Sequence, residues 1–328
     1  MTTITETPRS TIWRGYSGEG ATTWADSTGV FEGAIPLEKV RDELFGWEAK
    51  EGDVSINVLD ESGVSTYQAP EFKGIVNPSN GRVMGIHSQS YGLHQFPEWL
   101  LVKVGNILDD DLTIAGAGTF AWGAVAFVQI EMPETSEVHG VKFRTFLNAA
   151  TSHNGSISST YTPGNTLIIC SNMMGSAFAG GFKVRHTANS LGRISNLREA
   201  LGILQGEKES FATEVDKRLN TTVTEAQWQE FVDTYTGLNR PHLSARSRAI
   251  SDRKARELHA MWGSSPMVEP FRGTAFGVLQ VVSTARHHLS TVRGATRAER
   301  NMLSMVTGTN AAADNKVLTL LDRVLANA

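Results

Sequence analysis

The spacing of apolar residues changes near residue 190 of this chain, and that change limits the fold more than any other feature. Before it, short runs such as Val54–Leu59 and Val141–Ala149 alternate apolar and polar residues between Gly, Pro, Asn and Ser, which predicts half-buried strands. After it, apolar residues recur every three or four positions, as in Leu191–Leu204, which predicts amphipathic helices. Short connections favour antiparallel pairing. We therefore expect an α+β fold with a mainly antiparallel N-terminal sheet and packed helices, followed by an α-helical C-terminal part.

The same patterns divide the chain into three parts. Residues 1–35 are rich in Gly, Ser and Thr without a sustained period, so we expect an extended arm that Trp13 and Trp24 anchor on another surface. A sheet-rich α+β core follows over 36–190, and a helical region covers 191–328.

Individual elements follow from local patterns and turn residues. The strands are expected at 54–59, 65–68, 82–89, 113–119, 122–131, 141–149, 156–162, 165–170 and 183–187. The helices are expected at 36–47, 97–108, 173–179, 191–204, 225–235, 247–262, 272–291, 297–306 and 311–326. Thr224–Gln227 and Thr296–Glu299 match capping boxes, and the adjacent His287 and His288 are expected on a solvated helix surface.

Several classes of protein are disfavoured by composition and by missing motifs. The single cysteine, Cys170, excludes a disulfide framework or a multi-cysteine metal site. The longest apolar run, 119–130, is too short to span a membrane, which takes about 20 residues. The N-terminus lacks the pattern of a signal peptide, so a cytoplasmic protein is expected. No GxxxxGK[ST], HExxH or GxSxG motif occurs, and no cofactor or metal is expected.

Charge is unevenly distributed along the chain. Residues 1–190 carry 20 acidic and 12 basic side chains, whereas residues 236–300 carry 11 Lys or Arg against 4 Asp or Glu. Such a basic segment attracts phosphate backbones in a salt-sensitive way. Solvated helix faces explain the same charges equally well.

Alternation also places cations on strand faces. Lys142 with Arg144, and Lys183 with Arg185, each share one face of a strand. Cation stripes beside aromatic rings suit single-stranded DNA, whose backbone needs cations and whose bases stack. The expected nucleic-acid-binding residues are Lys142, Arg144, Lys183, Arg185, Arg246, Arg248, Arg253, Lys254 and Arg256, with Trp122 or Tyr91 stacking on bases. An ordinary solvated sheet face remains the alternative.

A short loop, His153–Ser156 (HNGS), joins two of the expected strands. Asn154 and Gly155 predict a tight type I′ turn, with His153 paired to a backbone carbonyl; a loop that faces a ligand is compatible with this. Cys170 is expected to be a buried small side chain, and a thiolate activated by His153 or His186 is the alternative. Asn172 is expected to cap a short helix.

Several motifs occur in a fixed order along the chain. They are Gly81–Tyr91 (GRVMGIHSQSY), Ala115–Val128, His153–Ser156 (HNGS), Ile168–Met173 (IICSNM), Val184–Thr187 (VRHT) and Gly273–Val282 (GTAFGVLQVV). This order resembles the phage/plasmid-like family built on "domain of unknown function 932", over about residues 65–290. Asn154, Ser171 and Met173 stand where that family usually has Asp, Gln and Thr. Asn154 would weaken metal chemistry at the loop, which favours a turn or a binding role.

The family's order of elements also looks like the hairpin and helix core of phage single-strand annealing proteins, a fold-level analogy. The resemblance implies an ATP-independent protein of phage or plasmid recombination, which binds single-stranded DNA and forms homo-oligomeric rings or filaments. That is our leading hypothesis. The alternatives are a structural or host-interaction protein without catalysis, and a metal-dependent nuclease or hydrolase.

Overall fold

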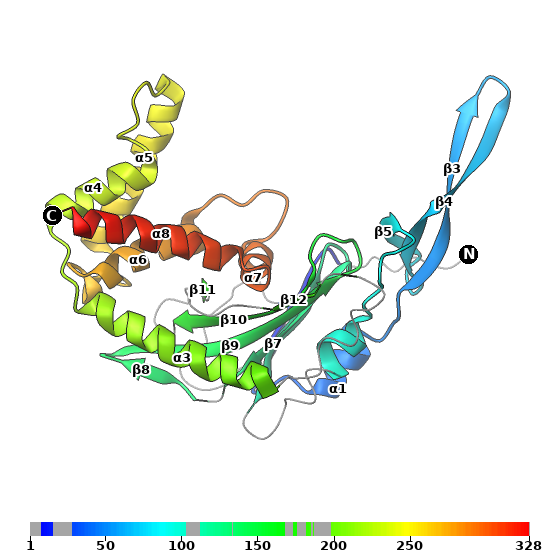
Figure 1. Cartoon of the computed structure of the whole chain (residues 1–328), viewed down its shortest axis with the longest axis horizontal. Helices are drawn as coiled ribbons and strands as arrows, with labels where there is room; N and C mark the ends of the chain where they lie inside the picture. The colour runs from blue at the N-terminus through cyan, green and yellow to red at the C-terminus, as the bar shows by residue number, and fades with distance from the viewer. Residues whose placement is uncertain are drawn as a thin grey trace.

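The computed structural model describes residues 8–15, 28–102, 112–132, 134–167, 173–175, 182–184, 186 and 198–327. Strands dominate the chain up to about residue 184, and the region 204–326 is helical. The predicted α+β class is therefore confirmed. In Figure 1 the large sheet lies at the centre, helices lie on both sides of it, and a narrow ribbon of strands projects at one end of the long axis.

A nine-stranded sheet is the framework of the molecule. Its main path runs in the order β11-β10-β9-β7-β6-β1-β2, with β8 and β12 paired to β9 and β10. The strands are β1 (Thr11–Gly15), β2 (Gly29–Phe31), β6 (Thr113–Phe120), β7 (Val125–Glu131), β8 (Ser136–Val138), β9 (Val141–Ser152), β10 (Ser159–Leu167), β11 (Met173–Gly175) and β12 (Phe182–Val184). All pairs are antiparallel except the parallel pair β1–β2.

Part of the expected N-terminal arm belongs to this sheet. Strand β1 pairs with β6 from Thr11 opposite Thr119 to Arg14 opposite Gly116. Its Ile12 and Trp13 are buried in the core. Because Trp13 is buried, it anchors the segment within its own sheet. The pairing of β1 also satisfies backbone donors and acceptors that β6 would otherwise expose at the edge of the sheet. Trp24 lies outside the described residues.

Two expectations around residues 156–179 were wrong. The two short strands predicted at 156–162 and 165–170 form one strand, β10, that continues through Pro163. On this edge of β10, strand β12 pairs with residues 159–161 and β11 pairs with residues 164–166. Pro163 falls in the gap between these two partner strands, where its missing N–H does not interrupt the pairing with either strand. Residues 173–175, expected to begin a helix, form strand β11.

A second, three-stranded sheet forms the projecting ribbon. It consists of β3 (Lys50–Asp60), β4 (Gly63–Asn77) and β5 (Arg82–Ser88) in that order. The outer half, Ser55–Asp60 paired with Gly63–Gln68, is a two-stranded hairpin, which Figure 1 shows extending beyond β5. The short strands expected at 54–59 and 65–68 are thus the outer half of a longer ribbon.

Helices cover both faces of the large sheet. Near the N-terminus lie α1 (Leu37–Lys39), the π-helical turns η1 (Val40–Leu44) and η2 (Pro97–Val102). The C-terminal part contains α3 (Arg198–Leu219), α4 (Glu225–Thr236), α5 (Ala245–Ser264), η4 (Glu269–Phe271), α6 (Ala275–Thr284), η5 (Ala285–Leu289), α7 (Arg297–Val306) and α8 (Thr309–Ala326). The N-terminal turns pack on the face bearing Ala126 and Val128. Helix α7 packs on the face bearing Phe120 and Phe127.

Most predicted helices are present with shifted ends. Helix α3 continues to Leu219, well beyond the expected end at 204, and α6 starts after Thr274, whose side chain accepts a hydrogen bond from the N–H of Gly277. The capping box of Thr224 and Gln227 is complete. At α7 only half of the predicted capping box forms. The side chain of Thr296 accepts a hydrogen bond from the N–H of Glu299, but the Glu299 carboxylate pairs with Arg9 and not with the N–H of Thr296.

No helix among the described residues is both long enough and apolar enough to cross a membrane.

Candidate functional site

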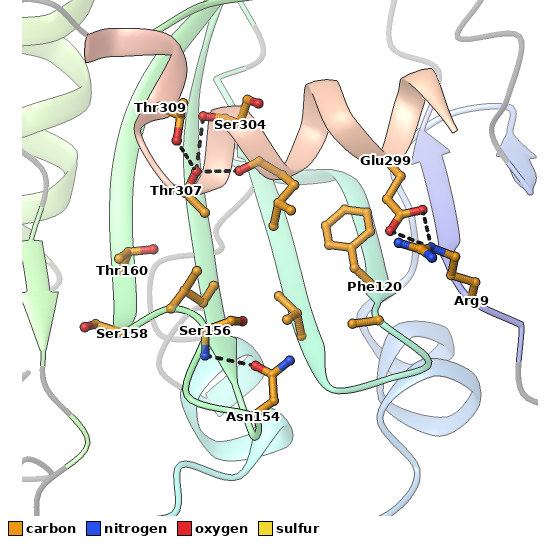
Figure 2. A pocket seen from close by; sticks show the side chains of 14 residues that line it. Arg9, Phe120, Asn154, Ser156, Ser158, Thr160, Glu299, Ser304, Thr307 and Thr309 are labelled. Atoms are coloured by element: carbon orange, nitrogen blue, oxygen red, sulfur yellow. Dashed lines mark hydrogen bonds and ion pairs between the residues drawn. The ribbon is translucent and has the colours of Figure 1, made fainter. Parts of the chain in front are cut away.

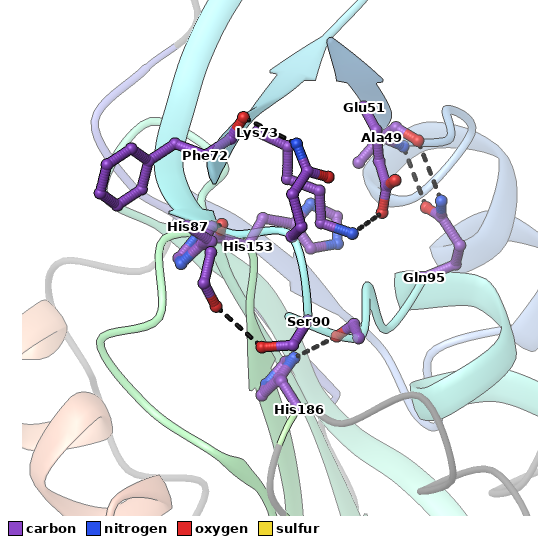
Figure 3. A network of polar contacts seen from close by, with 12 residues as sticks. Ala49, Glu51, Phe72, Lys73, His87, Ser90, Gln95, His153 and His186 are labelled. Carbon is purple, nitrogen blue, oxygen red and sulfur yellow. Dashed lines mark hydrogen bonds and ion pairs between the residues drawn. The ribbon is translucent and has the colours of Figure 1, made fainter. Parts of the chain in front are cut away.

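Segments that the sequence analysis singled out as motifs meet at one place beside the central sheet. Tyr91, His153 and His186 come from three separate motifs and lie together with His87 and His94. Figure 3 shows His87, His153 and His186 between the base of the ribbon and the end of the large sheet. The order of motifs along the chain therefore reflects a common location.

Aromatic rings in this cluster form a continuous stack. The ring of Tyr91 lies parallel to His87, with centroids 3.9 Å apart, and to His186 at 4.8 Å. His186 stacks on His94 at 4.1 Å, and His94 stacks on Trp99 at 3.7 Å. Such a column is rigid because its three inner rings are each held on both sides by flat neighbours.

Hydrogen bonds to backbone carbonyls fix the orientation of these rings. Nε2 of His87 lies 2.9 Å from the carbonyl oxygen of His153, and Nε2 of His153 lies 3.0 Å from that of His94. Nδ1 of His186 lies 3.1 Å from the carbonyl oxygen of Gly92. The prediction that His153 pairs with a backbone carbonyl is confirmed. The hydroxyl of Tyr91 donates to the carbonyl of Ser152 at 3.0 Å, and burial raises its pKa.

Burial keeps His153 and His186 neutral near pH 7. It lowers the pKa of His153 to about 4, with further lowering by nearby His186 and His87. The pKa of His186 is lowered by burial as well. A neutral imidazole both donates and accepts, so these two rings can each bond a backbone carbonyl without adding a positive charge to the cluster.

A chain of hydroxyl groups connects two of the rings. His94 Nδ1 lies 2.7 Å from Ser159 Oγ, which lies 2.7 Å from Thr151 Oγ1. Thr151 Oγ1 is 3.5 Å from His186 Nε2. This resembles a histidine-activated hydroxyl in its contacts, but His94, Thr151 and Ser159 are all buried. A substrate does not reach Ser159 Oγ in this arrangement, so the network acts as a scaffold.

The base of the ribbon is tied to the same region by polar contacts, also drawn in Figure 3. Lys73 binds Glu51 at 2.8 Å across the two strands. The side chain of Gln95 donates to the carbonyl of Ala49 and accepts from its N–H, both at 2.9 Å. The first contact joins two strands of the ribbon, and the contact between Gln95 and Ala49 holds the start of the ribbon against the segment that carries His94.

The HNGS loop is wider than predicted. Gly155 has a positive φ of 70°, but Asn154 does not, so the turn is not type I′. The Asn154 side chain instead accepts a hydrogen bond from the N–H of Ser156 at 3.0 Å, and Ser152 Oγ bridges both backbone groups of Ile157. These side-chain contacts replace the backbone bonds of a tight hairpin.

On its outer side this loop lines an open cleft of about 670 Å³ between the sheet and α7. Figure 2 shows Asn154 and Ser156 on one wall and Thr307 and Thr309 on the other. The lining also includes Phe120 and is rich in hydroxyl and amide groups: Asn154, Ser156, Ser158, Thr160, Ser304, Thr307 and Thr309. The Arg9–Glu299 ion pair, 3.3 Å between Nε and Oε1, closes one end. Such a surface suits a polar ligand with several hydrogen-bonding groups.

Trp122 lies in the turn between β6 and β7, next to Ala121, which lines this cleft. It was expected to begin a strand, but residues 121–124 form the connection, and Ala121 and Trp122 both have positive φ in a turn closed by the N–H of Gly123, which donates to the carbonyl of Phe120 at 3.1 Å. The guanidinium of exposed Arg82 lies 4.4 Å from the Trp122 ring, and that of Arg9 lies 5.0 Å from it. The partly exposed indole is thus in contact with two cations.

The predicted cation stripe on β9 and β12 is only partly in place. Arg144 is largely buried and forms an ion pair with Glu131, 2.9 Å between Nη1 and Oε1, so it is not an exposed phosphate ligand. Lys142 is half-buried opposite Glu137 of β8. The backbone of Lys183 lies in β12. The Lys183 side chain and Arg185 lie outside the described residues.

The other predicted cations are exposed on α5. Arg246, Arg248, Arg253, Lys254 and Arg256 lie around a helix that packs on α4 and α6 through Ala255 and Leu258. In Figure 1, α5 lies at the end of the long axis opposite β5, which carries Arg82. The cations of α5 and the two arginines beside Trp122 therefore do not form one continuous basic surface.

Sequence reasoning missed His87, His94, Arg9 and Arg82. His87 lies in the motif Gly81–Tyr91, but nothing in a single sequence shows that its ring stacks on that of Tyr91. The predicted Cys170 and Asn172 lie outside the described residues. Among the described residues, no three His, Cys, Asp or Glu side chains are arranged to hold a metal ion.

Comparison with known proteins gives one match. The model of the family described as "Domain of unknown function (DUF932)" matches residues 83–306. No curated protein and no solved structure matches the chain. The matched range contains the ring stack, the HNGS loop, Trp122 and the whole of α7.

Proposed function

Since the chain belongs to this family, which has no assigned activity, we propose from the site itself that it is a single-stranded DNA-binding protein. The proposed interface comprises Trp122, its two arginines and the hydroxyl-lined cleft beside the HNGS loop. The buried histidine stack is its rigid support. Annealing of complementary strands without ATP is the activity that we propose for it, in the cytoplasm of a bacterial host that carries a phage or plasmid.

One observation carries this proposal: a partly exposed indole in contact with two guanidinium groups at the edge of a polar cleft. Single-stranded DNA needs cations for its backbone and flat surfaces for its bases, without strict sequence preference. Arg82 is exposed and lies at the end of the ribbon's base strand. On binding, the Arg82 guanidinium would move from the Trp122 ring to a phosphate of the DNA. The face of the ring that it uncovers would then stack on a base.

The cleft would then hold the next nucleotide. Hydroxyl and amide groups such as those of Asn154, Ser158 and Thr309 line it, and they donate to and accept from both phosphate oxygens and base edges. The mixture of donors and acceptors supports sequence-tolerant binding. Annealing requires strands that are held by their backbones, so that base edges stay free for pairing.

Binding is favoured over hydrolysis because the polar groups that resemble catalytic ones are buried. His94 and Ser159 are each 1% exposed, whereas Arg82 and Asn154 lie at the surface or at half-burial. The accessible chemistry of the site is therefore hydrogen bonding, charge attraction and stacking.

The test is fluorescence anisotropy of labelled single-stranded DNA with the full chain. Trp122→Ala is expected to weaken binding about tenfold, because stacking of a base on an aromatic ring contributes about 1–3 kcal/mol, while Trp122→Phe retains most of the affinity. Arg82→Glu is expected to weaken binding and to lower the slope of log K against log salt by about 0.7 for the lost phosphate contact.

Lys316→Glu is the matched control, because this exposed cation lies on α8 away from the cleft. It should leave affinity and salt slope near those of the wild type. Equal affinity of the wild type and Trp122→Ala would contradict the proposed interface. Magnesium-dependent cleavage of the labelled strand would instead favour the nuclease alternative, and complementary strands mixed with the protein report annealing directly.

A further inference from the structure

The outer half of the ribbon exposes apolar side chains that no part of the described chain covers. Ile56 and Tyr67 face each other across β3 and β4 and are each 59% exposed, and Val58 lies on the same face. On the other face, Leu59 at 79% and Val64 at 68% form a second exposed pair. An isolated two-stranded hairpin is marginally stable in water, and patches of this kind mark interaction surfaces.

The acidic residues of the ribbon indicate the charge of the surface that it can bind. Between residues 52 and 72 the sequence carries four acidic side chains and no Lys or Arg, and the preceding Glu51 is paired with Lys73. Asp60 and Glu61 lie at the tip of the hairpin, and Asp53 and Glu71 lie nearer its base. An acidic surface repels the phosphates of nucleic acids and membranes. The partner of the ribbon is therefore a basic protein surface with some apolar area.

This chain has such a surface at its other end. The helix α5 carries five cations against Asp252 and Glu257. Its first turns, from Ala245 to Ile250, are fully at the surface, and Ile250 is 41% exposed. Arg246, Arg253 and Arg256 lie opposite the side of the helix that packs through Ala255 and Leu258.

The two surfaces also match in length. Six residue pairs of the hairpin, from Ser55–Gln68 to Asp60–Gly63, span about 20 Å at the rise of a strand. The exposed stretch of α5 from Ala245 to Arg256 spans about 18 Å at 1.5 Å per residue. The two lie at opposite ends of the long axis in Figure 1, so one molecule cannot bring its own ribbon onto its own α5.

We propose that the ribbon of one copy docks on α5 of a second copy. Ile56, Val58 and Tyr67 would cover Ile250, and the acidic residues of the ribbon would lie against the arginines of the helix. Such a contact uses two different surfaces, so it leaves a free ribbon at one end of a pair and a free α5 at the other. Head-to-tail contacts of this type continue into rings or filaments. The proposal is independent of the DNA interface, because it involves neither Trp122 nor the cleft.

The test is sedimentation velocity of the nuclease-treated full chain over a range of concentrations, at low and high salt. The wild type is expected to form species larger than the 35.6 kDa monomer, which grow with concentration and shrink at high salt. The helix variant carries Arg246→Glu, Arg253→Glu and Arg256→Glu. The ribbon variant carries Ile56→Thr and Tyr67→Thr, which keep residues suited to strands. Each variant alone is expected to be monomeric.

The mixture of the two variants is the decisive sample. The helix variant keeps an intact ribbon and the ribbon variant keeps an intact α5, so an equal mixture should form a dimer of twice the monomer mass that does not grow further. The control, Lys316→Glu with Arg323→Glu, changes two exposed cations of α8 and should assemble as the wild type does. Circular dichroism and melting temperature verify that the variants are folded, which is expected because all altered side chains are exposed.

Three results would overturn the proposal. A wild type that stays monomeric at every concentration shows that the ribbon has another partner. A helix variant that still assembles while the ribbon variant does not shows that two ribbons pair with each other. Large species that form in a parallel sample without nuclease, but not in the treated one, show that nucleic acid bridges the copies.

Discussion

Protonation of His153 is expected to make the protein sensitive to acid. Its ring is 1% exposed, and burial lowers its pKa in the folded protein from 6.5 to about 4. Between these two values the unfolded chain holds a proton that the folded chain does not, so stability falls as the pH falls from about 6.5 to about 4. Integrated between pH 6.5 and pH 4.5 with these two pKa values, this proton uptake removes about 2 kcal/mol of the free energy of unfolding.

The substitution that isolates this effect is His153→Gln. The amide of Gln can still donate to the carbonyl of His94, the partner of His153 Nε2, but it does not titrate. Urea unfolding followed by tryptophan fluorescence, at neutral pH and at about pH 4.5, gives the free energy of unfolding of each protein. The wild type should lose about 2 kcal/mol more than the variant between the two pH values.

A matched control uses an exposed histidine. His242 lies in the turn before α5 with a φ of 60°, a conformation that Asn also tolerates. His242→Asn should retain the acid sensitivity of the wild type. If His153→Gln loses as much stability on acidification as the wild type, the assignment of the acid-labile step to the ring stack is refuted.

Four further predictions concern packing, charge and capping. Gly118→Ala should destabilise the sheet by several kcal/mol or prevent folding, because an added Cβ would lie 2.1 Å from the carbonyl oxygen of Thr11; expression and melting temperature report this. Glu131→Gln should cost about 3 kcal/mol in urea unfolding, because it leaves the buried Arg144 without its ion-pair partner. Thr224→Ala should cost about 1 kcal/mol by loss of the capping box, again by urea unfolding. His287→Gln should remove a second part of the acid sensitivity, since burial lowers the pKa of His287 to about 3.

The outcome for His287 shows where local patterns fail. Adjacent histidines near a helix end were expected at a wet surface, but His287 is buried between α6 and the helices that follow. Only the packing of α7 and α8 on this helix decides which of the two rings is enclosed. The capping signal at Thr296 failed in part for the same reason, since a residue far along the chain, Arg9, took the carboxylate of Glu299.

The sequence by itself determined the fold class and the approximate position of most elements, because strand and helix periods are local properties of the chain. It also marked Tyr91, His153, Asn154, Ser156, His186 and Trp122 as residues of interest.

Only the tertiary structure decided which of these residues lie together. It stacked Tyr91 on His186, placed Arg82 over Trp122, and buried Arg144 with Glu131. It also separated the cations of α5 from the cleft and left the ribbon uncovered. These outcomes depend on strand order and on contacts between residues far apart in sequence, which the alternation of side chains along a strand does not specify.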